Sequence, residues 1–177
     1  MKFTKEDARK RVLNCAKQYQ QNLLHKKLLI IFRERQDNSI RFIEIIFHER
    51  NYQHLTGLEL TNTEGKILQH QSKNFYRKCI ENKLGLNDVD KVMGGVNFCL
   101  GLSRENDVFV PSSALLRGYQ KLTSSPSQVL AIFEKDIDSE LYSTVKHVAK
   151  GLNLHHLILP PEISSKISLE HYVYRGK

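Results

Sequence analysis

The side chains best suited to catalysis come directly after the stretch of the chain in which the alternation typical of a strand is most regular. Residues 47–58 read Phe-His-Glu-Arg-Asn-Tyr-Gln-His-Leu-Thr-Gly-Leu, which places two histidines, an arginine, a hydroxyl and a glycine in what we predict to be a turn after a strand. The ends of strands are where a rigid scaffold commonly presents catalytic or binding groups. These residue types suit phosphate chemistry, so this stretch is the first candidate site.

His54, Arg50 and Thr56 together meet the needs of RNA cleavage without a metal ion. Such cleavage requires a base for the ribose 2′-hydroxyl, an acid for the leaving oxygen and cations for the phosphate. Histidine serves as acid or base near neutral pH, and arginine fits phosphate geometrically. Within one turn the three side chains can converge. The alternative is a structural corner in which His54 bonds to backbone, Thr56 caps and Gly57 takes a positive φ, and the chemistry alone favours this alternative.

Two other motifs give less support to a site. Gly94-Gly95 with Gly101 does not form GxGxxG, and no P-loop lysine follows, so a turn that feeds a strand is the better interpretation. His147 and His155-His156 come without HExxH, a carboxylate at ligand spacing or a thiolate, so a solvated pair is favoured over a metal centre. We therefore expect neither a metal nor another cofactor.

Positive charge is concentrated near the start of the chain. The net charge of the 177 residues is +8, which favours polyanionic partners, with nucleic acid first. Residues 1–27 contribute +6 of this, because eight Lys and Arg face only Glu6 and Asp7. Any single lysine fits a solvated helix face, but six uncompensated charges repel one another unless something acidic is near. We expect nucleic acid to contact this segment through Lys5, Arg9, Lys10 and Lys17.

The elements that must position these residues predict an α+β fold. Residues 4–25 indicate a helix with Thr4 as N-cap and an apolar stripe that includes Cys15. The further predicted elements are strands 28–34 and 40–47, a pair 58–60 and 66–68, a helix 73–83 that Ser72 caps, strands 96–102 and 108–111, a helical turn 112–116, a strand 129–134, a helix 140–150 and a strand 167–174. Hairpins imply antiparallel pairing, so we expect the basic helix and the other helices to pack on an antiparallel sheet.

The bulk properties indicate one domain over residues 1–177, with a basic helix at 1–27, a core at 28–136 and a C-terminal helix with strands at 137–177. The three cysteines lie far apart and form no CxxC pair, which argues against a disulfide framework or a zinc knuckle. No apolar run approaches the length that spans a membrane. We expect a soluble cytoplasmic protein without a membrane partner.

Residues 51–58 resemble the N-F-x-H-L-T-G-I signature of a phage-associated nuclease family named for Barnase, EndoU, colicin and RelE, the BECR superfold. Three looser likenesses follow in the same order. Residues 74–79 are similar to the aromatic helix after the signature, residues 109–116 to a strand with P-x-S-L-L, and residues 129–135 to a strand that ends in lysine. The resemblance covers residues 28–136, and it implies a helical part on an antiparallel sheet and a metal-independent ribonuclease.

Carried over by position, the resemblance implies His54 and Thr56 in the signature, Ser113 after the proline and Lys135 at the strand end as catalytic candidates. Their chemistry suggests the roles. His54 would be general base or acid, Arg50 and Lys135 would contact the phosphate, and Thr56 and Ser113 would orient it. The basic helix would hold flanking backbone.

Two functions remain open. The first is a metal-independent endoribonuclease or RNA-binding domain of phage or mobile-element origin that acts as a toxin. RNA is its favoured partner, and an antitoxin or another protein is a further one. The second is a non-enzymatic nucleic-acid-binding or inhibitor protein on an inactive nuclease fold, such as a phage counter-defence protein that acts on a host nuclease complex. The short segment 85–95 motivates the second.

Overall fold

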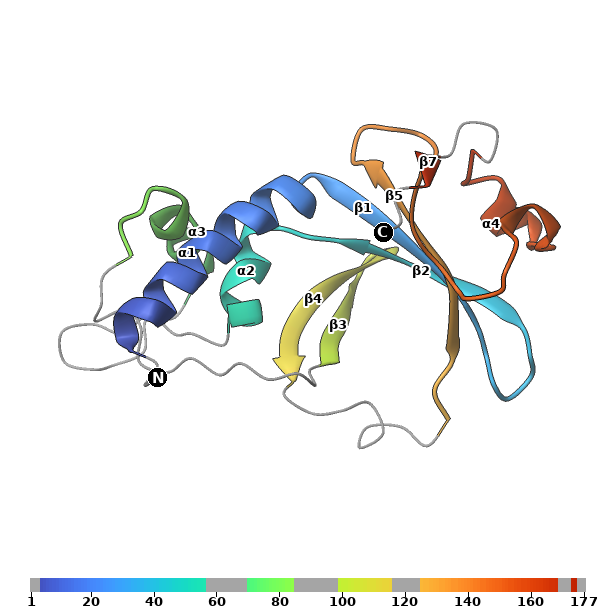
Figure 1. Cartoon of the computed structure of the whole chain (residues 1–177), viewed down its shortest axis with the longest axis horizontal. Helices are drawn as coiled ribbons and strands as arrows, with labels where there is room; N and C mark the ends of the chain where they lie inside the picture. Colours follow the sequence, from blue (N-terminus) through green and yellow to red (C-terminus); the bar gives the residue numbers. More distant parts are fainter. Residues whose placement is uncertain (1–3, 57–69, 85–98, 116–124, 169–172, 175–177) are drawn as a thin grey trace. The chain divides into compact units, whose positions relative to one another are not determined.

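The computed structural model describes residues 4–56, 70–84, 99–115, 125–168 and 173–174 (Figure 1). The elements, in chain order, are α1 (Lys5–Asn22), β1 (Lys26–Arg33), β2 (Ile40–Ile46), α2 (Glu49–Thr56), α3 (Ser72–Ile80), β3 (Cys99–Glu105), β4 (Val108–Leu115), β5 (Gln128–Asp136), β6 (Thr144–Val148), a 3₁₀ turn η3 (Leu154–His156), α4 (Pro161–Ser164) and β7 (Val173–Tyr174). The predicted α+β class is confirmed. The predicted strands 58–60 and 66–68 and the segment 85–95 lie outside the described residues.

The described residues fall into two compact units. The first takes its residues from Met1–Leu24, Phe47–Ser103 and Val110–Gly118, and the second from His25–Ile46, Arg104–Phe109 and Tyr119–Lys177. Each unit is described by itself below. The expectation of a single domain over residues 1–177 stays a prediction.

In the first unit, α1 begins as the sequence predicts. The Thr4 hydroxyl accepts a hydrogen bond from the Asp7 N–H at 3.1 Å, and the Asp7 carboxylate accepts the Thr4 N–H at 3.0 Å, which forms a reciprocal capping box. The apolar stripe of α1 is buried at Ala8, Val12, Ala16 and Tyr19. The expected inward position of Cys15 is wrong, because this residue is exposed and lies on the wall of a cavity.

Aromatic contacts join the three helices of the first unit. The ring of Tyr19 on α1 lies 5.2 Å from that of Tyr52 on α2 and 6.1 Å from that of Tyr76 on α3, measured between centroids. Phe75 and Cys79 of α3 are buried. The expected Ser72 cap is not observed, because the helix begins at Ser72 and Gln71 occupies the cap position without a side-chain bond. Buried rings on each helix stabilise the unit more than helix propensity does.

The strands form one mixed sheet in the order β3-β4-β2-β1-β5-β6-β7. Within the second unit, β1 pairs antiparallel with β2 and with β5, and β5 pairs antiparallel with β6. Parallel pairing joins Ile45 of β2 with Phe109 of β4, and β6 with β7. The predicted hairpin of β1 and β2 is confirmed, and Asn38 takes a φ of 58° in its turn. The parallel pairs arise because longer connections return the chain to the sheet.

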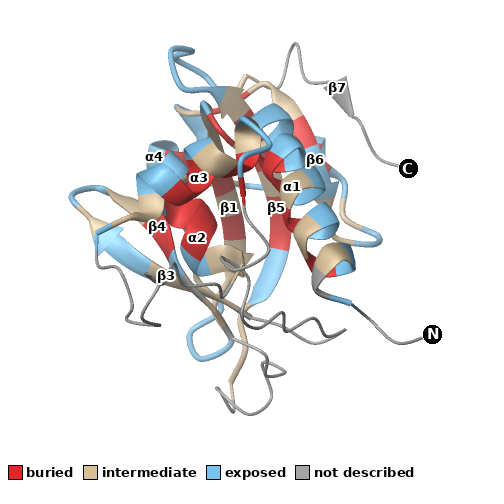
Figure 2. Ribbon diagram, turned by 90° about the vertical axis from the view of Figure 1, so that its left-hand side faces the viewer, coloured by how far each residue is buried: buried red, intermediate tan, exposed pale blue. Residues whose placement is uncertain are grey.

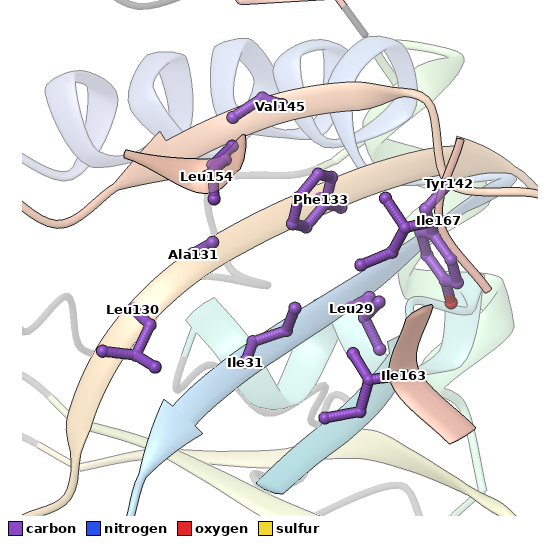
Figure 3. Close-up of a cluster of buried hydrophobic side chains, with 10 residues drawn as sticks. All are labelled: Leu29, Ile31, Leu130, Ala131, Phe133, Tyr142, Val145, Leu154, Ile163 and Ile167. Carbon is purple, nitrogen blue, oxygen red and sulfur yellow. The ribbon is translucent and has the colours of Figure 1, made fainter. Parts of the chain in front are cut away.

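The core of the second unit lies on one face of this sheet (Figure 3). Strand alternation places Leu29 and Ile31 of β1 beside Phe133 of β5, all fully buried, while Ile163 of α4 packs on the same cluster. The remaining members of the cluster are Leu130, Ala131, Tyr142, Val145, Leu154 and Ile167.

Two sequence predictions about this half of the chain are wrong. The helix expected over residues 140–150 is the strand β6, in which Val145 is buried and pairs with Phe133 of β5. Leu141, Val145 and Val148 have helical spacing, but the β-branched residues of this segment pack better on a sheet that already offers an unpaired edge. The helical turn expected over residues 112–116 is instead the end of β4, which continues to Leu115.

Candidate functional site

Within the predicted catalytic turn at residues 48–57, the helix α2 covers Glu49–Thr56, and Gly57 lies outside the described residues. Much of α2 is buried (Figure 2). Its Asn51, Tyr52 and Gln53 are buried, whereas Arg50 and His54 are exposed. Residues four apart lie on the same face of a helix, one turn from each other. The structure therefore brings Arg50 and His54 together on an accessible surface, as an imidazole and a guanidinium that can reach one anion.

The buried side of α2 explains why the segment is helical. The side chain of Asn51 accepts a hydrogen bond from the His48 N–H at 2.8 Å and donates one to the Pro111 carbonyl at 2.8 Å. The first bond caps the helix start, and the second ties α2 to β4. Tyr52 donates from its hydroxyl to the Val12 carbonyl of α1 at 2.5 Å. The signature residues Asn51 and Tyr52 thus hold the helix in place.

Thr56 does not converge with His54. A helix turns by about 100° per residue, so Thr56 points about 160° away from His54 around the axis. Thr56 instead follows Tyr52 toward α1, where both line a cavity of 580 Å³, and its hydroxyl donates to the Gln53 carbonyl at 2.7 Å. The expected meeting of Arg50, His54 and Thr56 requires a turn, and the helix prevents it.

The cavity between α1 and α2 combines an apolar interior with polar groups. Its walls include Val12, Tyr19, Leu23, Tyr52 and Leu55, and its polar lining comes from Arg11, Gln18, Asn22 and Thr56. A volume of this size accommodates a small organic group such as a nucleobase. Amide and guanidinium donors beside an aromatic ring are the groups that commonly recognise an unstacked base.

The basic residues of α1 divide into two kinds. Lys10 and Lys17 are exposed and line a second hollow, of 400 Å³, beside α3. Arg9 is committed to structure, because its Nε donates to the Leu84 carbonyl at 2.6 Å and its Nη1 lies 3.5 Å from the Glu6 carboxylate. Of the predicted nucleic-acid contacts on α1, Lys10 and Lys17 are the ones best placed to meet a ligand.

Two predicted residues are described by their backbone alone. Lys5 begins α1 and Ser113 lies in β4, and the structure does not describe either side chain. Ser113 comes two residues after Pro111, whose carbonyl accepts the Asn51 bond. Ser113 therefore belongs to the strand that α2 contacts.

Lys135 belongs to the second unit, whereas the other catalytic candidates belong to the first. Its ammonium lies among charged residues around Glu44 of β2, and Glu44 is buried. Glu44 accepts hydrogen bonds from the Tyr142 hydroxyl at 2.8 Å and Lys166 at 3.1 Å, and its carboxylate lies 3.2 Å from the Lys27 ammonium. Lys135 donates to the carbonyls of Ser139 and Glu140 at 2.6 and 2.8 Å.

The surroundings of Glu44 and Lys135 shift both groups. Burial alone would raise the pKa of Glu44, but the bonds from Tyr142 and Lys166 and the charge of Lys27 outweigh it, so the pKa lies below its ordinary value. The pKa of Lys135 is lowered, first by burial and then by repulsion from Lys27. One set of charges contributes to both shifts.

The sequence did not identify the group of interacting side chains formed by Glu44, Lys27, Lys166 and Tyr142. A signal for Glu44 was present, because it follows Ile40 and Phe42 on the inward face of a strand, where a carboxylate needs a partner. The partners of Glu44 come from β1 and from the C-terminal part of the chain, and no local sequence pattern predicts that they meet it. Among the described residues, no group of three or more His, Cys, Asp or Glu side chains gathers as metal ligands would.

An α+β fold with a helix that exposes arginine and histidine beside a basic helix fits a protein that handles phosphodiesters. Residues 11–95 match the family described as phage-Barnase-EndoU-ColicinE5/D-RelE like nuclease4. The match includes Arg50, His54 and Thr56 and confirms the resemblance for this part of the chain, whereas Ser113 and Lys135 lie beyond it. Comparison with curated proteins and with solved structures gave no match. In the described part of the chain, no helix is long and apolar enough to cross a membrane.

Proposed function

We propose that this chain is a metal-independent endoribonuclease whose reaction centre is the exposed face of α2. The observation that carries the proposal is the pairing of Arg50 and His54, exposed one turn apart, inside the segment that matches a nuclease family. The guanidinium neutralises the phosphate, and the imidazole moves a proton at near-neutral pH.

In this proposal His54 removes the proton of a ribose 2′-hydroxyl, and the 2′-oxygen attacks the adjacent phosphorus. The bond from phosphorus to the 5′-oxygen breaks, and that oxygen leaves with a proton from His54 or from water. The products are a 2′,3′-cyclic phosphate and a 5′-hydroxyl. Arg50 stabilises the charge on the pentavalent phosphate.

The neighbouring elements supply binding. A base farther along the bound strand enters the cavity between α1 and α2, where Thr56 and Arg11 offer polar groups. Lys10 and Lys17 hold flanking phosphates from their exposed positions on α1. Ser113 on β4 keeps its proposed role of orienting the phosphate. The protein acts in the cytoplasm, with an antitoxin-like protein as a further partner.

The test is RNA cleavage in the presence of EDTA. We expect the wild-type protein to cut RNA and leave cyclic phosphate ends, and His54→Ala to abolish this. His147→Ala is the matched control, because His147 is also exposed but lies on β6 in the second unit. Cleavage that EDTA stops, or that survives His54→Ala, contradicts the mechanism.

A second function is a non-enzymatic protein that binds RNA or a nuclease–RNA complex. It is favoured by one observation: within the described ranges, no hydrogen bond holds the imidazole of His54, whereas a catalytic base is commonly oriented by a third group. Binding of RNA without turnover, together with a protein complex that survives gel filtration, would favour this function over the nuclease.

A further inference from the structure

The second unit contains more positive charge around Glu44 than that carboxylate needs. Lys27 of β1, Lys135 of β5 and Lys166, which follows α4, are gathered there. The charge of Glu140 also acts on Lys135, so three ammonium groups and two carboxylates leave a local charge of +1. None of these residues takes part in the chemistry proposed for α2.

The register of the sheet brings two of these charges together. Lys27 and Lys135 are direct partners across the antiparallel pair of β1 and β5. Like charges at directly opposed positions destabilise a sheet. Glu44 compensates Lys27 and Lys166, but Lys135 is held by two backbone carbonyls and by the ring of Tyr142, 5.0 Å from its Nζ. The charges of Glu44 and Glu140 attract Lys135, but its direct partners in the described part of the chain are neutral groups, and its pKa is lowered.

An ion pair in the same unit shows what a structural role requires. Lys146 of β6 lies 3.1 Å from the buried Glu134 of β5, with one lysine for one carboxylate. Glu134 and Glu44 are about equally buried, yet Glu44 has two lysines in contact and a third beside them. The additional cations exceed what burial of one carboxylate explains.

We propose that Lys27, Lys135 and Lys166 form a binding site for a phosphate group, with Glu44 and Tyr142 as positioning residues. An ammonium has three N–H donors, and the bonds described above use one on Lys27, one on Lys166 and two on Lys135. Each lysine thus retains a donor for phosphate oxygens. A bound phosphate monoanion balances the local charge of +1 and reduces the repulsion between Lys27 and Lys135.

Glu44 and Tyr142 explain how the site stays formed without a ligand. The carboxylate holds Lys27 and Lys166 at 3.2 and 3.1 Å, and Tyr142 bonds to the same carboxylate while its ring lies under Lys135. Tyr142 is also part of the hydrophobic core, beside Ile167 (Figure 3). The ammonium groups are therefore held by the rigid part of the unit, which lowers the entropy that binding would cost.

The test is titration with inorganic phosphate, followed by calorimetry and by NMR of the lysine ammonium groups. We expect wild type and Lys146→Gln to bind alike, and Lys135→Gln to bind about tenfold more weakly, since it loses a charged hydrogen bond. Lys135→Gln is the decisive variant, because Lys135 bonds to carbonyls and its loss leaves Glu44 paired. Lys135→Arg should retain binding.

A short RNA added as competitor then identifies the source of the phosphate. Displacement of inorganic phosphate by RNA assigns the site to a nucleic-acid backbone, and absence of displacement assigns it to a free phosphate or a monoester. Equal binding by wild type and Lys135→Gln, or no binding by wild type, overturns the proposal. His54→Ala serves to separate this site from the nuclease mechanism, because it should stop RNA cleavage and leave phosphate binding unchanged.

Discussion

Replacement of Asn51 by alanine should destabilise the protein, although the residue belongs to the segment that resembles a catalytic signature. Asn51 is 4% exposed, and its side chain satisfies the His48 N–H and the Pro111 carbonyl. Alanine leaves both backbone groups without these partners. A buried group left unsatisfied costs about 1–3 kcal/mol, and the cost is smaller for the half-buried helix start. We expect a loss of about 2–4 kcal/mol in the free energy of unfolding.

The measurement is urea unfolding followed by circular dichroism, with three variants compared. Asn14→Ala on α1 is the matched control, because Asn14 is exposed in the same unit. It should change stability by less than about 0.5 kcal/mol, and so should His54→Ala, since exposed substitutions away from special features have small effects. The comparison separates the structural role of Asn51 from the proposed catalytic role of His54, which belongs to the same octapeptide. If Asn51→Ala unfolds at the same urea concentration as Asn14→Ala, the assigned role of Asn51 is wrong.

Three further outcomes are expected. The pKa of Glu44 is lowered in the folded state, so the unfolded state binds more protons in acid. The stability that ionised Glu44 contributes above pH 4.5 should therefore be lost as the pH falls. The urea midpoint of Glu44→Gln should lack this contribution to the pH dependence. Lys10→Gln with Lys17→Gln should flatten the slope of log K against log salt for single-stranded RNA by about 1.4, and Lys150→Gln, at another exposed lysine, should affect it less. Phe133→Ala should cost about 3–5 kcal/mol in urea unfolding, because Phe133 is fully buried, and a smaller loss would place the core elsewhere.

Local sequence patterns determined the elements whose stabilising contacts are close in the chain. Thr4 and Asp7 form the cap that the sequence predicts, and the Asp37-Asn38-Ser39 turn joins two β-rich strands as expected. These features depend on side chains that bond to nearby backbone or alternate along one strand, so the sequence shows them directly. The sequence also identified His54 as a candidate acid or base, and this role stays a prediction.

Tertiary structure decided the geometry of both sites. Residues 49–56 contain a turn-like set of polar side chains, but Asn51 and Tyr52 find partners on β4 and α1, and these bonds stabilise a helix that separates Thr56 from His54. Likewise, β6 is a strand because β5 offers an edge. The lysines around Glu44 come from three segments of the chain that are distant in sequence. Such proximity depends on long-range register and packing, which no local spacing of residues encodes.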